Sequence, residues 1–203
     1  MAKRAIERGW RRERVLKADF FSQVEIGRWP ERWGDDLVVM RDAGASVWWI
    51  KPVAHFMIRK EVRALRRLTE AGYPHAPHLL HWDGRYLCRS WHAGEALKTA
   101  QVRDPGFYRA AFGILRRLHR LGIAHNDLAK EPNWLVTADG RPFLIDFQLA
   151  KVAPRRGWLF RRMAREDLRY LLKHKRKYCP EAMTVREKRI ASTPGLFSRV
   201  WRK

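Results

Sequence analysis

The sequence of 203 residues contains only two cysteines, Cys88 and Cys179, which excludes a disulfide scaffold and a four-cysteine zinc site. No window approaches the ~18 uninterrupted apolar residues of a membrane-spanning helix. Residues 1–17 lack the apolar core of a secretory signal. We find no internal repeat and no low-complexity linker. These absences together predict a cytoplasmic protein.

Acidic residues are also scarce, with 21 Asp and Glu against 43 Lys and Arg, a net charge of +22. The hydrophobic fraction of 46% and the ten tryptophans are enough to build a core, which excludes wholesale disorder. Basic residues concentrate in residues 1–17, 151–165 and 173–189. This charge predicts attraction to an anion: a nucleic acid, phosphate-rich lipid headgroups or a nucleotide.

The first half of the chain is typical of strands with one helix. Strands are expected at residues 20–26 and 37–41, and a third at 46–51 (SVWWIK) after a hairpin turn at Asp42–Ala45. Residues 56–69 change to helical spacing. A second hairpin is expected around Asp83-Gly84, between LLHW and RYLCRSW.

The second half is mainly helical. Asp104-Pro105 predicts the start of a helix over 105–121, with a buried stripe that includes Phe107 and Leu115. Two short strands follow, WLVT and PFLIDF, and then further helix. We therefore predict an α+β fold of two lobes: a basic segment 1–18, an antiparallel-sheet lobe 19–93 and a reduced, mainly helical lobe 94–203 with basic C-terminal helices.

The segments HNDLAKEPN (125–133) and LIDFQ (144–148) place polar groups on loops next to apolar strand residues. The apolar flanks fix the backbone, so we expect these groups to project into a shared space. A carboxylate there can orient a hydroxyl group and take its proton, and an asparagine oxygen with a second carboxylate offers ligands that Mg²⁺ prefers. A lysine beside them neutralises charge on a moving phosphoryl group. These are the parts of a phosphotransfer site.

HNDLAKEPNWLV resembles the catalytic loop of protein-kinase-like enzymes, and IDFQ resembles their metal-binding Asp-Phe-Gly. WWIK is similar to the strand that bears their nucleotide-binding lysine, and Glu61 resembles the glutamate that pairs with it. The motifs occur in the family order over most of the chain. The short chain and near-absent activation segment look most like the small bacterial lipopolysaccharide-core sugar kinases (Kdo and heptose kinases), and the RIO-type atypical protein kinases are also similar.

The resemblance implies ATP and Mg²⁺ as cofactors and a role for each matching residue. Lys51 would bind the α- and β-phosphates and Glu61 would orient it. Asp127 would position and deprotonate the acceptor hydroxyl, and Lys130 would neutralise transition-state charge. The remaining roles are Mg²⁺ binding by Asn133 and Asp146, bracing of the loop by His125, and contact with adenine at the hinge by Ser90, Trp91 and His92.

Several features depart from the family pattern. The stretch from Asp127 to Asn133 is one residue longer than usual, Gln148 replaces the glycine of Asp-Phe-Gly, no G-x-G-x-x-G precedes Lys51, and no Ala-Pro-Glu follows Phe147. The missing Ala-Pro-Glu argues against an ordinary Ser/Thr kinase that reads peptides. A lipopolysaccharide-core sugar is the favoured acceptor, and an anionic inner-membrane surface would be a peripheral partner.

Other interpretations stay open. The acceptor could be a protein, as in RIO-type kinases, or the chain could be a nucleic-acid- or ribosome-binding protein on a kinase scaffold. Trp158 in the basic stretch 151–165 could insert at a membrane interface or pack against the second lobe. The histidines between His75 and His92 match no strong zinc signature.

Overall fold

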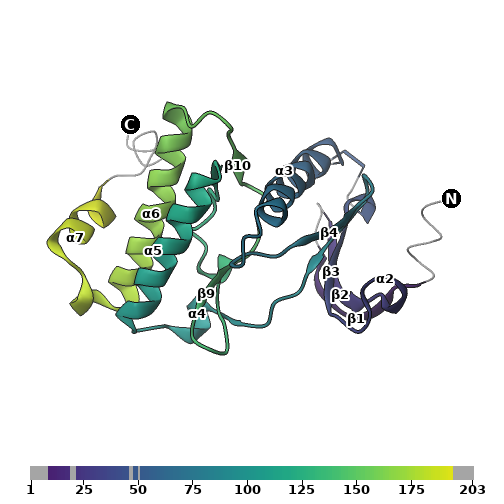
Figure 1. Cartoon of the computed structure of the whole chain (residues 1–203), viewed down its shortest axis with the longest axis horizontal. Helices are drawn as coiled ribbons and strands as arrows, with labels where there is room; N and C mark the ends of the chain where they lie inside the picture. Colours follow the sequence, from purple (N-terminus) through teal and green to yellow (C-terminus); the bar gives the residue numbers. More distant parts are fainter. Residues whose placement is uncertain (1–8, 19–21, 46–47, 50, 194–203) are drawn as a thin grey trace. The chain divides into compact units, whose positions relative to one another are not determined.

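The computed structural model describes residues 9–18, 22–45, 48–49 and 51–193. It is an α+β protein whose chain divides into two units, one up to His92 and one from Ala93 onward. The predicted boundary was between residues 93 and 94. Each unit has its own sheet structure and its own helices, which Figure 1 labels along the chain.

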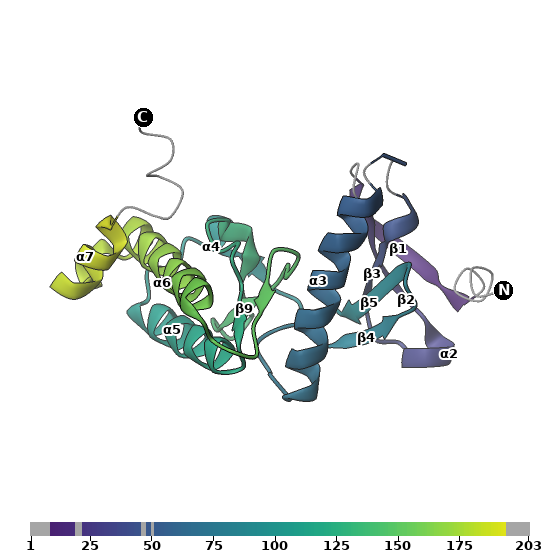
Figure 2. The same cartoon turned by 90° about the horizontal axis from the view of Figure 1, so that it is seen from above.

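The first unit contains a five-stranded antiparallel sheet in the order β1-β2-β3-β5-β4. Helix α3 lies against this sheet (Figure 2). The elements of the unit are β1 (Arg11–Ala18), β2 (Gln23–Arg28), α2 (Pro30–Trp33), β3 (Val38–Asp42), the 3₁₀ turn η1 (Ala43–Ala45), α3 (Lys51–Glu70), β4 (Leu79–Trp82) and β5 (Tyr86–Ser90).

Alternation along the strands fills both faces of the sheet, because successive side chains point to opposite sides. Val38 and Met40 pack in one cluster with Trp29, Tyr86 and Cys88. The intervening Val39 packs with Val24 and Ile26 in another cluster. The expected stripe of α3 is confirmed, since the side chains at its helical spacing are all buried: Ile58, Val62, Leu65 and Leu68.

The expected strand at residues 46–51 is wrong. Lys51 begins helix α3, and Trp48 and Trp49 lie in an exposed turn; Ser46, Val47 and Ile50 are outside the described residues. The place beside β3 is taken by β5, since Asp42 pairs with Tyr86 and the N–H of Ala43 donates to the carbonyl of Arg85 at 3.0 Å. Pro52 also suits the first turn of a helix.

The hairpin turn expected at Asp42–Ala45 is also wrong: Ala43–Ala45 form a 3₁₀ turn, and the next described element of secondary structure is helix α3, which begins at Lys51. The Asp42 carboxylate accepts the Gly44 N–H at 2.6 Å and pairs with the Arg85 guanidinium at 2.8 Å. The basic segment 1–18 is also not separate from the sheet lobe, because Arg11–Ala18 form β1, which pairs with β2. Residues 1–8 lie outside the described residues.

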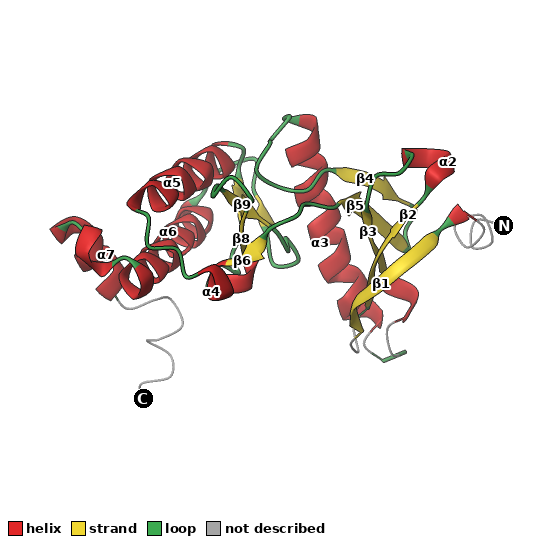
Figure 3. Ribbon diagram, turned by 90° about the horizontal axis from the view of Figure 1, so that it is seen from below, coloured by secondary structure: helices red, strands yellow, loops and turns green. Residues whose placement is uncertain are grey.

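The second unit packs three main helices and several short strands (Figure 3). Strands β6, β8 and β9 form one sheet, and β7 pairs with β10. The elements are β6 (Glu95–Ala96), α4 (Leu97–Ala100), α5 (Pro105–Arg120), β7 (Ile123–Ala124), η2 (Glu131–Asn133), β8 (Trp134–Val136), β9 (Pro142–Leu144), β10 (Lys151–Val152), α6 (Trp158–Tyr178), η3 (Pro180–Ala182) and α7 (Val185–Ser192).

The predicted start of α5 is confirmed: the Asp104 carboxylate accepts the Gly106 N–H at 2.8 Å and Pro105 occupies the first helical position. Its buried stripe is also as expected, from Phe107 to Leu118. Among the described residues, no helix is long and apolar enough to cross a membrane.

Candidate functional site

The loop of residues 125–133 joins β7 to β8 in the second unit, and Asp146 follows the end of β9. The two segments meet where the N–H of Ile145 donates to the carbonyl of Asn133 at 3.0 Å. Asn126 and Asp146 both adopt the left-handed region, at φ 63° and 64°. Such strain in residues other than glycine persists only where the surroundings impose it, and it concentrates at functional sites.

Asp127 is the centre of a small polar cluster on this loop. Its Oδ2 accepts from Lys130 Nζ at 2.7 Å and from Asn133 Nδ2 at 3.2 Å, while its main-chain carbonyl accepts from Asn133 Nδ2 at 2.9 Å. The hydrogen bond to Asp127 raises the pKa of Lys130, and the charges of Asp127 and Asp146 add to the effect. The structure therefore brings the four predicted residues of this unit together: Asp127, Lys130, Asn133 and Asp146.

Asp146 has an unsatisfied oxygen. Its Oδ1 is buried and has no hydrogen-bond partner among the described residues, which is costly for a carboxylate. Asn133 turns its amide nitrogen toward Asp127, so the amide oxygen is the atom of that side chain able to bind a cation. These two oxygen donors fit Mg²⁺, which is commonly held by one or two protein ligands and by substrate phosphates. The described residues contain no cluster of three or more His, Cys, Asp or Glu side chains suited to a metal.

His125 braces the loop from the interior of the second unit. The residue is fully buried, its Nε2 lies 2.9 Å from the carbonyl oxygen of Ile145, and its ring centroid is 4.7 Å from that of Phe147. The structural role expected for His125 agrees with these contacts.

The sequence analysis missed Asp167 on α6, which anchors the start of the loop. Its carboxylate accepts the backbone N–H groups of His125 and Asn126, both at 2.8 Å, and lies 3.0 Å from His119 Nε2. Asp167 is 1% exposed. The available signal was an acid next to the apolar stripe of α6, because a buried carboxylate in a helix needs partners.

A second set of α6 residues holds the far end of the loop. His174 Nε2 lies 2.7 Å from the carbonyl oxygen of Leu128, and Glu131 accepts from Lys177 Nζ and Tyr178 Oη, both at 2.7 Å. Burial lowers the pKa of His174. Because a carbonyl oxygen only accepts, Nε2–H of His174 is the donor to Leu128. Burial alone would raise the pKa of Glu131, but the hydrogen bonds from Lys177 and Tyr178 lower it.

The anchoring residues of α6 recur along one side of the helix. Asp167, His174 and Tyr178 are separated by seven and four residues, the spacing that returns to the same face. One polar row on α6 therefore fixes both ends of the loop that presents Asp127.

The expected pair of Lys51 and Glu61 in the first unit is wrong. Lys51 is exposed at the start of α3, and ten residues of helix separate it from Glu61 by about 15 Å. The Glu61 carboxylate, 1% exposed, lies instead 3.0 Å from Arg41 Nη1 on β3 and 3.7 Å from Arg89 Nε on β5. The missed signal was the strand VVMR, in which Arg41 follows three apolar residues and is itself buried.

The three residues expected at the hinge lie at the end of β5. Ser90 Oγ accepts the N–H of His78 at 2.9 Å, and the N–H of Trp91 donates to the carbonyl of Leu37 at 3.1 Å. Trp91 packs against the cluster of Val24, Ile26 and Val39. His92 is the last residue of the first unit.

Comparison with protein-family models and with curated proteins gave no match for this chain.

Proposed function

We propose that this protein is an ATP- and Mg²⁺-dependent phosphotransferase with a two-lobed, protein-kinase-like architecture, and that it phosphorylates a hydroxyl group. The supporting observation is the cluster around Asp127: Lys130 and Asn133 bind its carboxylate on a loop anchored from α6, and Asp146, which has an unsatisfied oxygen, follows the adjacent strand β9. The proposal also rests on the resemblance of this loop to the catalytic loop of protein-kinase-like enzymes.

In the proposed reaction, Asp127 orients the acceptor hydroxyl and takes its proton. The acceptor oxygen forms a bond to the γ-phosphorus of ATP, the bond from that phosphorus to ADP breaks, and Lys130 offsets the charge on the phosphoryl oxygens. Asn133 and Asp146 would hold Mg²⁺, which supplies charge neutralisation at the phosphates when bound.

We propose that Arg41, and not Lys51, binds the α- and β-phosphates of ATP. Arg41 Nη1 lies 3.0 Å from the carboxylate of Glu61, which is 1% exposed, and Arg89 Nε lies 3.7 Å from the same carboxylate. A guanidinium that a buried carboxylate holds in place suits a phosphate group, because the planar guanidinium can bind phosphate in a bidentate manner.

We further propose that the acceptor is a sugar hydroxyl of the lipopolysaccharide core. The net charge of +22 favours an acceptor that carries phosphates, and the missing Ala-Pro-Glu argues against a peptide-reading segment. We place the protein in the cytoplasm, where ATP is available.

The test is transfer of labelled γ-phosphate from ATP, with Mg²⁺ or with EDTA, to purified core oligosaccharide, to a protein fraction and to RNA. We expect Mg²⁺-dependent label on the oligosaccharide. Label on protein alone would show that the acceptor is a protein, as in RIO-type kinases, and not a sugar. Salt-dependent RNA binding without any phosphate transfer would overturn the phosphotransferase proposal.

A further inference from the structure

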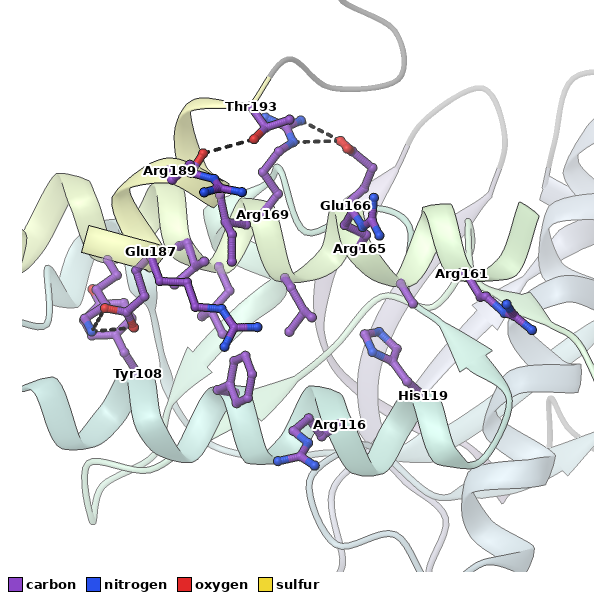
Figure 4. Close-up of a pocket in the computed structure, with 18 of the residues that line it drawn as sticks. Tyr108, Arg116, His119, Arg161, Arg165, Glu166, Arg169, Glu187, Arg189 and Thr193 are labelled. Atoms are coloured by element: carbon purple, nitrogen blue, oxygen red, sulfur yellow. Dashed lines mark hydrogen bonds and ion pairs between the residues drawn. The ribbon is translucent and has the colours of Figure 1, made fainter. Parts of the chain in front are cut away.

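A large groove lies between α5, α6 and α7 of the second unit, with a volume of about 2140 Å³. Figure 4 shows Arg116 on α5 and Arg161 and Arg165 on α6 along this groove. None of its lining residues is one of the four residues clustered around Asp127.

The groove has a large excess of positive charge. Among the described residues that line it, the acids are Glu166, which pairs with Arg169 at 2.6 Å, and Glu187, which pairs with Lys175 at 2.8 Å. The other arginines of the lining make no ion pair within the described part of the chain: Arg109, Arg116, Arg120, Arg156, Arg161, Arg162, Arg165, Arg186 and Arg189. So many unpaired cations on one concave face predict an anionic ligand with several charges.

Exposed apolar side chains lie in this groove and in the first turn of α6, next to it in sequence. Among the described residues of the second unit, four large hydrophobic residues are exposed. Phe112 and Val185 line the groove, and Trp158 and Leu159 lie in the first turn of α6. Trp158 is 71% exposed and Leu159 is 41% exposed.

Helix geometry places the tryptophan beside the arginines. Arg161, Arg162 and Arg165 follow Trp158 by three, four and seven residues, so they share one side of α6. An apolar side chain at the level of several phosphate-binding cations is the arrangement of a protein surface that lies in a membrane interface.

We propose that this groove and the first turn of α6 dock onto a lipid bilayer that contains anionic phospholipid. The arginines bind headgroup phosphates, and Trp158 and Leu159 insert at the boundary of headgroups and acyl chains. Trp158 and Phe112 are aromatic and could stack on bases, but Leu159 and Val185 are aliphatic and could not. A bilayer accommodates both kinds of side chain, so lipid fits better than nucleic acid. This inference goes beyond the proposed phosphotransferase and does not depend on it.

The test is co-sedimentation of the full chain with vesicles of phosphatidylcholine, or of phosphatidylcholine mixed with phosphatidylglycerol. Two double variants probe the surface, W158A/L159A and R161Q/R165Q. Two matched controls remove the same groups from exposed positions of the first unit, W48A/W49A and R63Q/R66Q. Apart from Trp48 and Trp49, which lie in a turn, all the substituted residues are on helix α3 or α6. Circular dichroism therefore reports whether each variant keeps its helices.

We expect binding only to the mixed vesicles, weaker at high salt, and an apparent affinity about 30-fold lower for R161Q/R165Q. W158A/L159A should also bind the mixed vesicles more weakly, whereas both control variants should bind them like the parent chain. The proposal is overturned if the chain stays in the supernatant, or if the controls lose as much binding as the matched variants. It is also overturned if single-stranded RNA displaces the protein and W158A/L159A binds vesicles unchanged, which would assign the groove to nucleic acid.

Discussion

The carboxylate of Asp167 accepts a hydrogen bond from the backbone N–H of Asn126 at 2.8 Å, although the two residues are 41 positions apart. Asn126 is in the left-handed region and immediately precedes Asp127. The contact therefore holds a strained residue next to the proposed catalytic carboxylate, and the stability of α6 and the geometry of the loop are linked.

Replacement of Asp167 by asparagine should lower the free energy of unfolding and loosen the loop that carries Asp127. The amide side chain would turn its NH₂ group toward one of the backbone N–H donors and leave that donor unpaired in the interior, at a cost of about 1–3 kcal/mol. Urea unfolding measures this loss. The matched control is Asp139→Asn at the exposed turn between β8 and β9, where we expect a change within about 0.5 kcal/mol. Equal stability of the two variants would contradict the anchoring role.

His174 predicts a pH dependence of stability. Burial holds the pKa of its ring below the ordinary value of 6.5 in the folded state. As the pH falls through 6.5, the unfolded chain takes up a proton that the folded chain does not, so the free energy of unfolding decreases on acidification.

The measurement is urea unfolding of the parent chain and of His174→Gln above and below this pH. We expect the parent chain to lose more stability than the variant between pH 7.5 and about pH 5.5. Glutamine keeps an N–H donor for the Leu128 carbonyl. Parallel pH curves for the two chains would show that His174 titrates alike in both states.

The stability of two variants tests whether Glu61 pairs with Arg41, as in the structure, or with Lys51, as the sequence predicted. Glu61→Gln leaves two guanidinium groups facing a neutral amide in a buried site, so we expect a loss of about 3–5 kcal/mol in the free energy of unfolding. Lys51→Ala removes an exposed side chain at the helix start and should change stability by less than about 0.5 kcal/mol. A larger effect of Lys51→Ala than of Glu61→Gln would restore the pairing expected from the sequence.

The two cysteines should be unreactive in the folded protein. Cys88 is fully buried in the sheet, and burial raises its pKa to about 12; Cys179 is also buried, and burial raises its pKa. Since the thiolate is the nucleophile, we expect no alkylation by iodoacetamide at pH 8 until urea unfolds the chain. Mass spectrometry counts the added groups, and modification of Cys88 in the native state would contradict this burial.

Local patterns predicted those elements that depend on nearby residues. The stripe from Ile58 to Leu68 and the cap at Asp104 need only helical periodicity and one side-chain acceptor, and both are confirmed. The strand predicted for SVWWIK was wrong. Its aromatic and branched residues favour a strand, but β5 occupies the position beside β3 in the sheet. Sheet order is a long-range property that no local window contains.

The candidate site divides in the same way. Asp127, Lys130 and Asn133 lie within seven residues, so a loop motif could identify them, and the short connection through β8 and β9 brings Asp146 alongside. Asp167 and Arg41 could not be assigned from the sequence, because their roles depend on partners 41 and 20 positions away. For each, the only signal was a charged residue in an otherwise apolar pattern.

The most direct test of the proposed function is the rate of γ-phosphate transfer from ATP by Asp127→Asn, with Asp139→Asn as the control. Both changes remove one carboxylate charge, and the amide introduced in Asp127→Asn keeps an oxygen that can accept from Lys130. We predict that Asp127→Asn folds normally and loses about 10²–10⁴-fold in rate, the contribution of a general base, while Asp139→Asn transfers phosphate like the parent chain. Equal rates for Asp127→Asn and the parent chain would contradict the assignment of this loop as the catalytic site.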